Sequence, residues 1–251
     1  MHRFITFSIS FLILHHCNFS LRLCLFTSFN KKLLVYHPMP KGSLAAALHS
    51  YGEIYCNLSL SYKINSVIFI DDKNESLSLE TRCRIAVGVA SGIEYLHSVG
   101  SGTVHGNIRS SNVFITEDYE ARVSEYGLAQ LVASSSSLNG YRAPEVLDTR
   151  VGSQKADVYG LGVLLLELLT GREPDGILTE EGVALPDWVQ TVVEEKGTAA
   201  VIDPSLFGRE ESVVELLLVA LSCTSRQPSE DDLSFPSSLA VQKMISRLLL
   251  H

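Results

Sequence analysis

Hydrophobic positions in the middle of the chain recur at helical spacing. Ser78, a residue type that caps helices, precedes a segment with Glu80 in its first turn and apolar residues every three or four positions. These apolar positions are Leu79, Cys83, Ala86, Ala90, Ile93 and Leu96. The pattern predicts one long helix that ends within the glycine-containing stretch 100–102.

Two further helices are predicted downstream. The stretch SQKADVYGLGVLLLELLTG (153–171) is apolar almost all the way round, and Gly171 is a typical stop. It is too short to cross a bilayer and contains Glu167, so we expect it to be the central buried helix of a domain. Another helix is expected from about Ser212 to Cys223.

Shorter apolar runs next to turn residues indicate strands. We predict strands at Leu33–Tyr36, Val113–Thr116 and Ala121–Ser124, with a helix starting near Ser43. A few short strands among longer helices favour an α+β fold that is mainly α.

Three segments do not fit this pattern. Residues 1–30 form an apolar extension, whose run Phe4–Leu14 has the length of a signal peptide or anchor but no convincing cleavage site. Residues 51–76 interrupt the helical segments and are interpreted as a surface insertion, with an extra hairpin as the alternative. Residues 229–251 are a divergent C-terminal tail, which leaves 31–228 as the domain.

Composition narrows the classes of partner and compartment. The 251 residues are 46% hydrophobic and 19% charged, an ordinary globular balance, and the net charge is −8. No run of Lys or Arg is present, so a nucleic-acid partner is not expected. The five cysteines are odd in number and contain no CxxC pair, which favours reduced thiols and no metal site.

A family resemblance rests on motifs in a fixed order. A helix is followed by HGNIRSSN (105–112), SEYG (124–127), APE (143–145) and DVYGLG…ELLTG (157–171). The chain resembles plant leucine-rich-repeat receptor-like kinases, and in GYRAPEV, SQKADVYG, LLLELLTGREP and EEGVALPDWV it resembles their inactive receptor kinase group. The resemblance implies a protein-kinase-like large (C-terminal) lobe with most of the small lobe missing.

The resemblance assigns the catalytic positions residue by residue. Kinases carry H-R-D-x-x-x-x-N, in which the Asp accepts the substrate proton and the Asn holds a metal ion. Asn112 matches that Asn, Arg109 stands in place of a phosphate-contacting Lys, and Asn107 replaces the Asp. A carboxamide is not basic near neutral pH, and losing a general base costs about 10²–10⁴ in rate, or roughly 3–5 kcal/mol.

The metal and nucleotide positions are degenerate as well. Glu125 stands where the metal-binding Asp of D-F-G is usual, and it would share the metal with Asn112. Tyr36 corresponds to the gatekeeper, the segment from His37 to Met39 corresponds to the hinge, and Phe114 crowds the adenine floor. No glycine-rich loop or strand lysine occurs upstream, so binding of ATP and Mg²⁺ is expected to be weak or absent.

The resemblance also implies structural roles. His105 is expected to pack in the core, and Asp157 is expected to hydrogen-bond the backbone of the catalytic loop. Glu145 lacks its usual Arg partner, because the P-x-x-R-P context reads PSEDD here. A buried carboxylate without a cation is costly, so a loosened C-terminal region is expected.

Three functions follow from these features. The preferred hypothesis is a pseudokinase that binds other proteins, including receptor kinases, in signalling at the cytoplasmic face of the plasma membrane. The alternatives are a weakly active Ser/Thr kinase and a truncated or mis-spliced product without function. The resemblance implies membrane association, and a cytosolic location is the alternative.

Overall fold

A computed structural model gives the structure of residues 22–28, 31–36, 39–49, 77–126, 141, 143, 152–174, 183–208, 210–225 and 236–248. The strands are β1 (Arg22–Ser28), β2 (Lys31–Tyr36), β3 (Val113–Ile115) and β4 (Ala121–Val123). The helices are α1 (Leu44–His49), α2 (Leu79–Val99), α4 (Gln154–Thr170), α5 (Leu185–Lys196), α6 (Glu210–Cys223) and α7 (Ser238–Leu248). Short 3-10 turns are η1 (Ser110–Asn112), η4 (Thr198–Ala200) and η5 (Pro204–Leu206).

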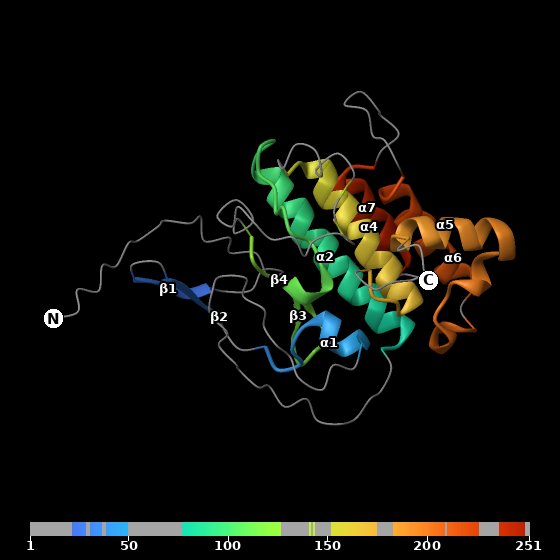
Figure 1. The fold of residues 1–251 in the computed structure, drawn as a ribbon, viewed down its shortest axis with the longest axis horizontal. Helices are drawn as coiled ribbons and strands as arrows, with labels where there is room; N and C mark the ends of the chain where they lie inside the picture. The colour runs from blue at the N-terminus through green and yellow to red at the C-terminus, as the bar shows by residue number, and fades with distance from the viewer. Residues whose placement is uncertain are drawn as a thin grey trace.

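The two longest helices form the centre of the lobe. In Figure 1, α2 and α4 run side by side, with β3 and β4 next to α2 and with α5 and α6 beyond α4. Each helix begins at a serine cap: Ser78 Oγ accepts from the Thr81 backbone at 3.3 Å, and Ser153 Oγ accepts from the Ala156 backbone at 2.9 Å. The predicted start of α2 and the predicted stop of α4 at Gly171, which adopts φ 65°, are both confirmed.

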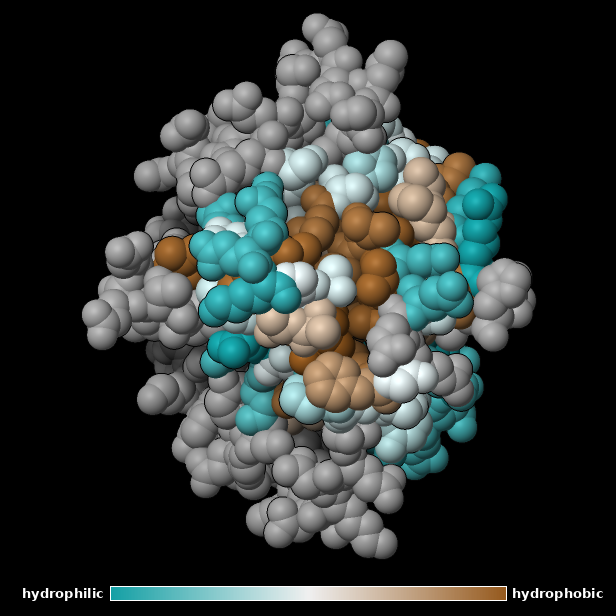
Figure 2. Space-filling view, turned by 90° about the vertical axis from the view of Figure 1, so that its right-hand side faces the viewer, coloured by the Kyte–Doolittle hydropathy of each residue, from teal (hydrophilic) through white to brown (hydrophobic). Residues whose placement is uncertain are grey.

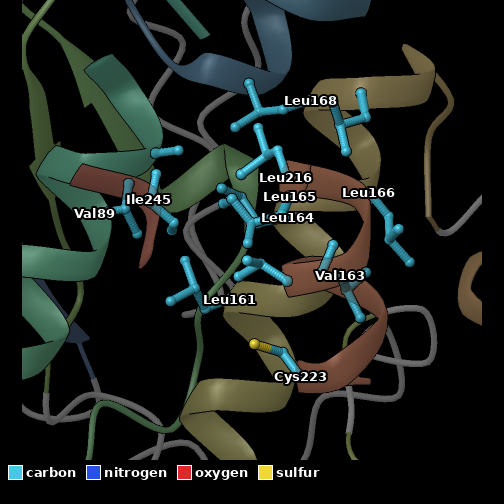
Figure 3. Close-up of a cluster of buried hydrophobic side chains, with 14 of the residues drawn as sticks. Val89, Leu161, Val163, Leu164, Leu165, Leu166, Leu168, Leu216, Cys223 and Ile245 are labelled. Carbon is cyan, nitrogen blue, oxygen red and sulfur yellow. The ribbon is translucent and has the colours of Figure 1, made fainter. Parts of the chain in front are cut away.

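Helix α4 is buried along nearly its whole length, as its all-apolar pattern predicts. Its leucines meet side chains from α2, α6 and α7 in the cluster of Figure 3, which includes Val89, Leu165, Leu216 and Ile245. Each of these four side chains is fully buried. The helix is therefore the hydrophobic axis around which the other helices pack.

Helices α4 and α6 approach closely at Gly162. A Cβ atom added there would lie 2.6 Å from the Cβ of Cys223 and 2.8 Å from the Cγ2 of Thr224. The absence of a side chain at this position is what lets the two helices touch.

The strands form two antiparallel pairs. Strand β3 pairs with β4 with Val113 opposite Val123, and each strand is one residue shorter than predicted. Strand β2 pairs with β1, which lies inside the segment interpreted as an apolar extension. Strand β1 is therefore an element that the hydrophobic pattern did not indicate.

Helix α7 is a second unexpected element, although its apolar residues recur at helical spacing. Residues 236–248 were interpreted as part of a divergent tail, yet Val241 and Ile245 are fully buried and α7 packs against α2. The Oγ of Ser238 lies 3.0 Å from Nδ1 of His97 on α2. The tail therefore contributes to the core of the lobe.

Several predictions fall outside the described residues. They concern the insertion at 51–76, the run Phe4–Leu14, the hinge residue His37 and the acid Glu145. They remain predictions.

Candidate functional site

The loop from 103 to 112 joins α2 to β3 and is held by one acid from α4. The carboxylate of Asp157 accepts hydrogen bonds from the backbone amides of His105 at 2.6 Å and Gly106 at 2.8 Å. Nε2 of His97 lies 3.0 Å from the same carboxylate. Asp157 is 2% exposed, so these donors replace water around a buried charge. Its predicted role in shaping the loop is confirmed.

His105 packs in the core beneath the loop, as predicted. Its ring is 1% exposed, and Nε2 donates to the carbonyl of Ser124 at 2.8 Å. Nδ1 accepts from the backbone amide of Asn107 at 3.2 Å. One nitrogen donates and the other accepts, which is the pattern of a neutral imidazole. The ring thus ties the loop to the strand end that precedes Glu125.

Three of the predicted site residues come together at this point. Nδ2 of Asn107 donates to Oε2 of Glu125 at 3.1 Å, and Nδ2 of Asn112 donates to the backbone carbonyl of Asn107 at 3.0 Å. Ser124 donates from both its backbone and its hydroxyl to the carbonyl of Asn112, at 2.8 and 2.9 Å. Glu125 adopts a left-handed φ of 64°, which turns the chain sharply after β4.

The hinge and adenine-floor residues are less completely defined. Tyr36 is the last residue of β2, where its backbone pairs with Arg22. Met39 is half-buried, and its carbonyl accepts from the Gly42 amide at 3.1 Å. Phe114 on β3 is half-buried and forms a β-bridge with Ser43, so the segment after the hinge lies against the predicted floor.

A buried polar cluster lies beneath the site, and sequence reasoning did not assign it. Glu167 of α4 is fully buried and accepts from Ser110 Oγ at 2.7 Å, from His49 Nε2 at 2.8 Å and from the Tyr141 hydroxyl. Burial and the neighbouring Glu167 carboxylate raise the pKa of Tyr141 well above its usual value. An acid inside an all-apolar helix was the available signal, but its partners come from distant segments.

Arg109 sits close to this cluster. Its guanidinium carbon lies 5.8 Å from the centre of the Tyr141 ring, within the range of a cation–π contact. The residue predicted to contact phosphate is therefore half-buried against the cluster.

A part-buried ion pair between α2 and the segment after α5 was also not predicted from the sequence. Arg82 of α2 is 3% exposed, and its Nη2 lies 2.7 Å from Oδ2 of Asp203, which follows α5. Burial acts to raise the pKa of Asp203, but hydrogen bonds from Ser205 and Arg82 outweigh it and lower that pKa. Arg82 also donates to two carbonyls, so its charge is well satisfied.

Comparison with known proteins agrees with this architecture. The arrangement of helices and paired strands is that of the large lobe of a protein kinase. A sequence model described as protein tyrosine and serine/threonine kinase matches residues 6–203, and the chain belongs to that family.

The most informative relatives are plant receptor kinases. The Arabidopsis thaliana "Probable inactive receptor kinase At1g48480" is 43% identical over 210 residues, covering 80% of this chain and 29% of the relative. "Probable inactive receptor kinase RLK902", from the same plant, is 42% identical and covers 80% and 30%. The chain thus spans less than a third of the length of these two curated relatives.

A solved structure supports the same fold. The pseudokinase domain of BIR2, described as an immune regulator of the RLK/Pelle family, is 31% identical with a TM-score of 0.71. The match covers 93% of this chain and 65% of that one.

Among the helices of the described residues, none has both the length and the apolar character needed to cross a membrane.

Proposed function

We propose that this chain is a pseudokinase, a kinase-type lobe that binds other proteins and transfers no phosphate. The observation that carries the proposal is the 3.1 Å hydrogen bond from Asn107 Nδ2 to Glu125 Oε2. An active kinase has a proton acceptor at the position of Asn107. Here that side chain is itself a donor, and it is turned toward the acid of the metal position.

The donor set does not fit the metal ions that protein kinases use with ATP. Mg²⁺ requires near-octahedral oxygen coordination, and kinases supply the carboxylate of the D-F-G Asp together with the amide oxygen of the catalytic-loop Asn. The misfit lies at Glu125, because its side chain is longer than that of Asp and its Oε2 already accepts from Asn107, whereas the hydrogen bond of the Asn112 amide nitrogen leaves the Asn112 oxygen available. We expect weak or absent binding of Mg-ATP.

Similarity to plant receptor kinases supports the biological setting. The relatives named above are described as inactive receptor kinases, and the BIR2 domain is described as a pseudokinase that regulates immunity. We therefore place the chain in receptor signalling at the cytoplasmic face of the plasma membrane, with other proteins, including receptor kinases, as partners.

The catalytic part of the proposal is tested by phosphoryl transfer. The full chain is incubated with radiolabelled ATP, a generic protein substrate and either Mg²⁺ or Mn²⁺. We expect no incorporation above a protein-free blank. The matched control is Asn112→Ala, because a contaminating kinase would be insensitive to it. Incorporation that this substitution abolishes would establish the weakly active Ser/Thr kinase instead.

A further inference from the structure

The outer face of α6 carries apolar side chains that the lobe does not cover. The inner face is the buried set Val213, Leu216, Leu217, Ala220 and Cys223. On the other side, Leu218 is 60% exposed, with the partly exposed Val214 four residues before it and Leu221, which is partly buried against the core, three residues after it. This spacing places the three on one stripe of the helix, which we call the α6 stripe.

The side of the molecule on which α6 lies carries an apolar area of surface. Figure 2, which faces the side where α5 and α6 lie in Figure 1, shows hydrophobic side chains bordered by hydrophilic ones. Phe207, just before α6, is also 60% exposed. Single exposed apolar residues are ordinary, but a stripe at helical spacing beside an exposed aromatic residue is typical of a docking surface.

The charges around the stripe select the kind of partner. Helix α6 contains Glu210, Glu211 and Glu215 and has no Lys or Arg. The side chains of Glu211 and Glu215 are exposed on α6, and on α5 Glu194 and Glu195 are exposed next to the exposed Lys196. A second copy of this chain would bring acidic groups against acidic groups, which disfavours self-association. A partner with Lys or Arg beside its apolar residues is complementary.

We propose that the α6 stripe docks an amphipathic helix from a partner protein, with apolar anchors on one face flanked by Lys and Arg. Leu218 would insert between the anchors of the partner helix, and Glu211 and Glu215 would meet its basic residues. The inference rests on the proposed binding role and names the partner class for it.

The probe is an 18-residue helical peptide of leucine and lysine with the leucines at i, i+3, i+4 and i+7. Its counterpart has glutamate in place of every lysine. Binding of each fluorescent peptide to the full chain is followed by anisotropy at two salt concentrations. We expect the lysine peptide to bind, the glutamate peptide to bind at least tenfold more weakly, and high salt to weaken binding.

Variants assign the binding to this face. Leu218→Asp should weaken lysine-peptide binding about tenfold or more, as expected for a central anchor. Val99→Asp is the matched control, because Val99 is 45% exposed at the end of α2. The double variant Glu211→Lys and Glu215→Lys should exchange the preference between the two peptides without touching the core.

Three results would overturn the proposal. In the first, Leu218→Asp and Val99→Asp weaken lysine-peptide binding equally. In the second, the lysine and glutamate peptides bind with equal affinity. In the third, the chain self-associates with increasing concentration and Leu218→Asp abolishes that self-association. None of these results involves ATP, so failure here is distinguishable from failure of the pseudokinase proposal, which the phosphoryl-transfer assay tests.

Discussion

The amide of Asn107 donates a hydrogen bond to the Glu125 carboxylate, and this bond stabilises the carboxylate without a cation. Asn107→Asp would place two carboxylates next to each other without a donor between them. We expect a loss of about 1–3 kcal/mol in the free energy of unfolding without divalent cations. A millimolar concentration of Mn²⁺ should recover part of that loss, because the cation binds only the folded form.

The measurement is urea unfolding of both proteins, with Mn²⁺ and with chelator. Asn107→Ala is the control, since it removes the hydrogen bond without adding charge and should not respond to Mn²⁺. If Asn107→Asp and Asn107→Ala behave alike in both conditions, the pairing with Glu125 does not determine the local electrostatics.

The Tyr141 hydroxyl is one of three donors to the buried Glu167 carboxylate. Tyr141→Phe should lower the free energy of unfolding by about 1–3 kcal/mol, because the carboxylate loses a donor that water cannot replace. Tyr119→Phe is the matched control, since Tyr119 is only partly buried. Equal stability of the two variants in urea at pH 8 would contradict the proposed importance of the cluster.

The same tyrosine gives a dependence on alkaline pH. Its folded pKa is raised above the usual value of 10.0, so the unfolded chain loses this proton first as pH increases. The stability contribution is therefore fully present below pH 10 and declines above it. Between pH 8 and about pH 10.5, the free energy of unfolding should fall less for Tyr141→Phe than for the unaltered chain.

At the level of elements, the contact between α4 and α6 depends on Gly162. Gly162→Ala should destabilise the lobe by about 1–3 kcal/mol, because the new methyl group overlaps Cys223 and Thr224 and the helices must separate. The control is Gly102→Ala, where an added Cβ meets nothing within 4 Å. Thermal unfolding of both variants tests this, and an unchanged melting temperature for Gly162→Ala would contradict it.

Local signals account for the elements that the sequence predicted correctly. The caps at Ser78 and Ser153 and the stop at Gly171 act on neighbouring residues, so helices α2 and α4 could be placed from the chain alone. Helix α7 was missed although Val241, Met244, Ile245 and Leu248 recur at helical spacing, because residues 229–251 were interpreted as a divergent tail. Strand β1 depends on its pairing with β2.

At the level of the whole molecule, the main prediction concerns nucleotide. The printed sequence contains no glycine-rich loop and no strand lysine to hold the phosphates, and Phe114 is predicted to crowd the adenine floor. We expect a Kd for Mg-ATP above about 1 mM, which corresponds to a binding free energy of less than roughly 4 kcal/mol in magnitude. Calorimetry and thermal shift of the full chain test this, beside Phe114→Leu and Asn107→Asp. Tight binding by the unaltered chain would contradict it, and absence of a cooperative melt would favour the truncated product.

Only the site residues that belong to a recognisable sequence motif could be predicted. Asn107, Asn112 and Glu125 could be grouped because two short motifs at known spacing carry them, and the structure brings them together. The cluster around Glu167 could not be assembled in the same way. His49, Ser110 and Tyr141 come from three separate segments, and only the folded chain shows that they share one carboxylate.

The hydrogen bond between His97 and Ser238 also has a consequence for folding during synthesis of the chain. The two residues are 141 positions apart, so α2 leaves the ribosome long before α7 can cover it. At about 5–20 residues per second, the interval is on the order of 7–30 seconds. During that time the apolar side of α2 that α7 later covers is open to solvent. We therefore expect that nascent chains need protection from aggregation until α7 has been synthesised.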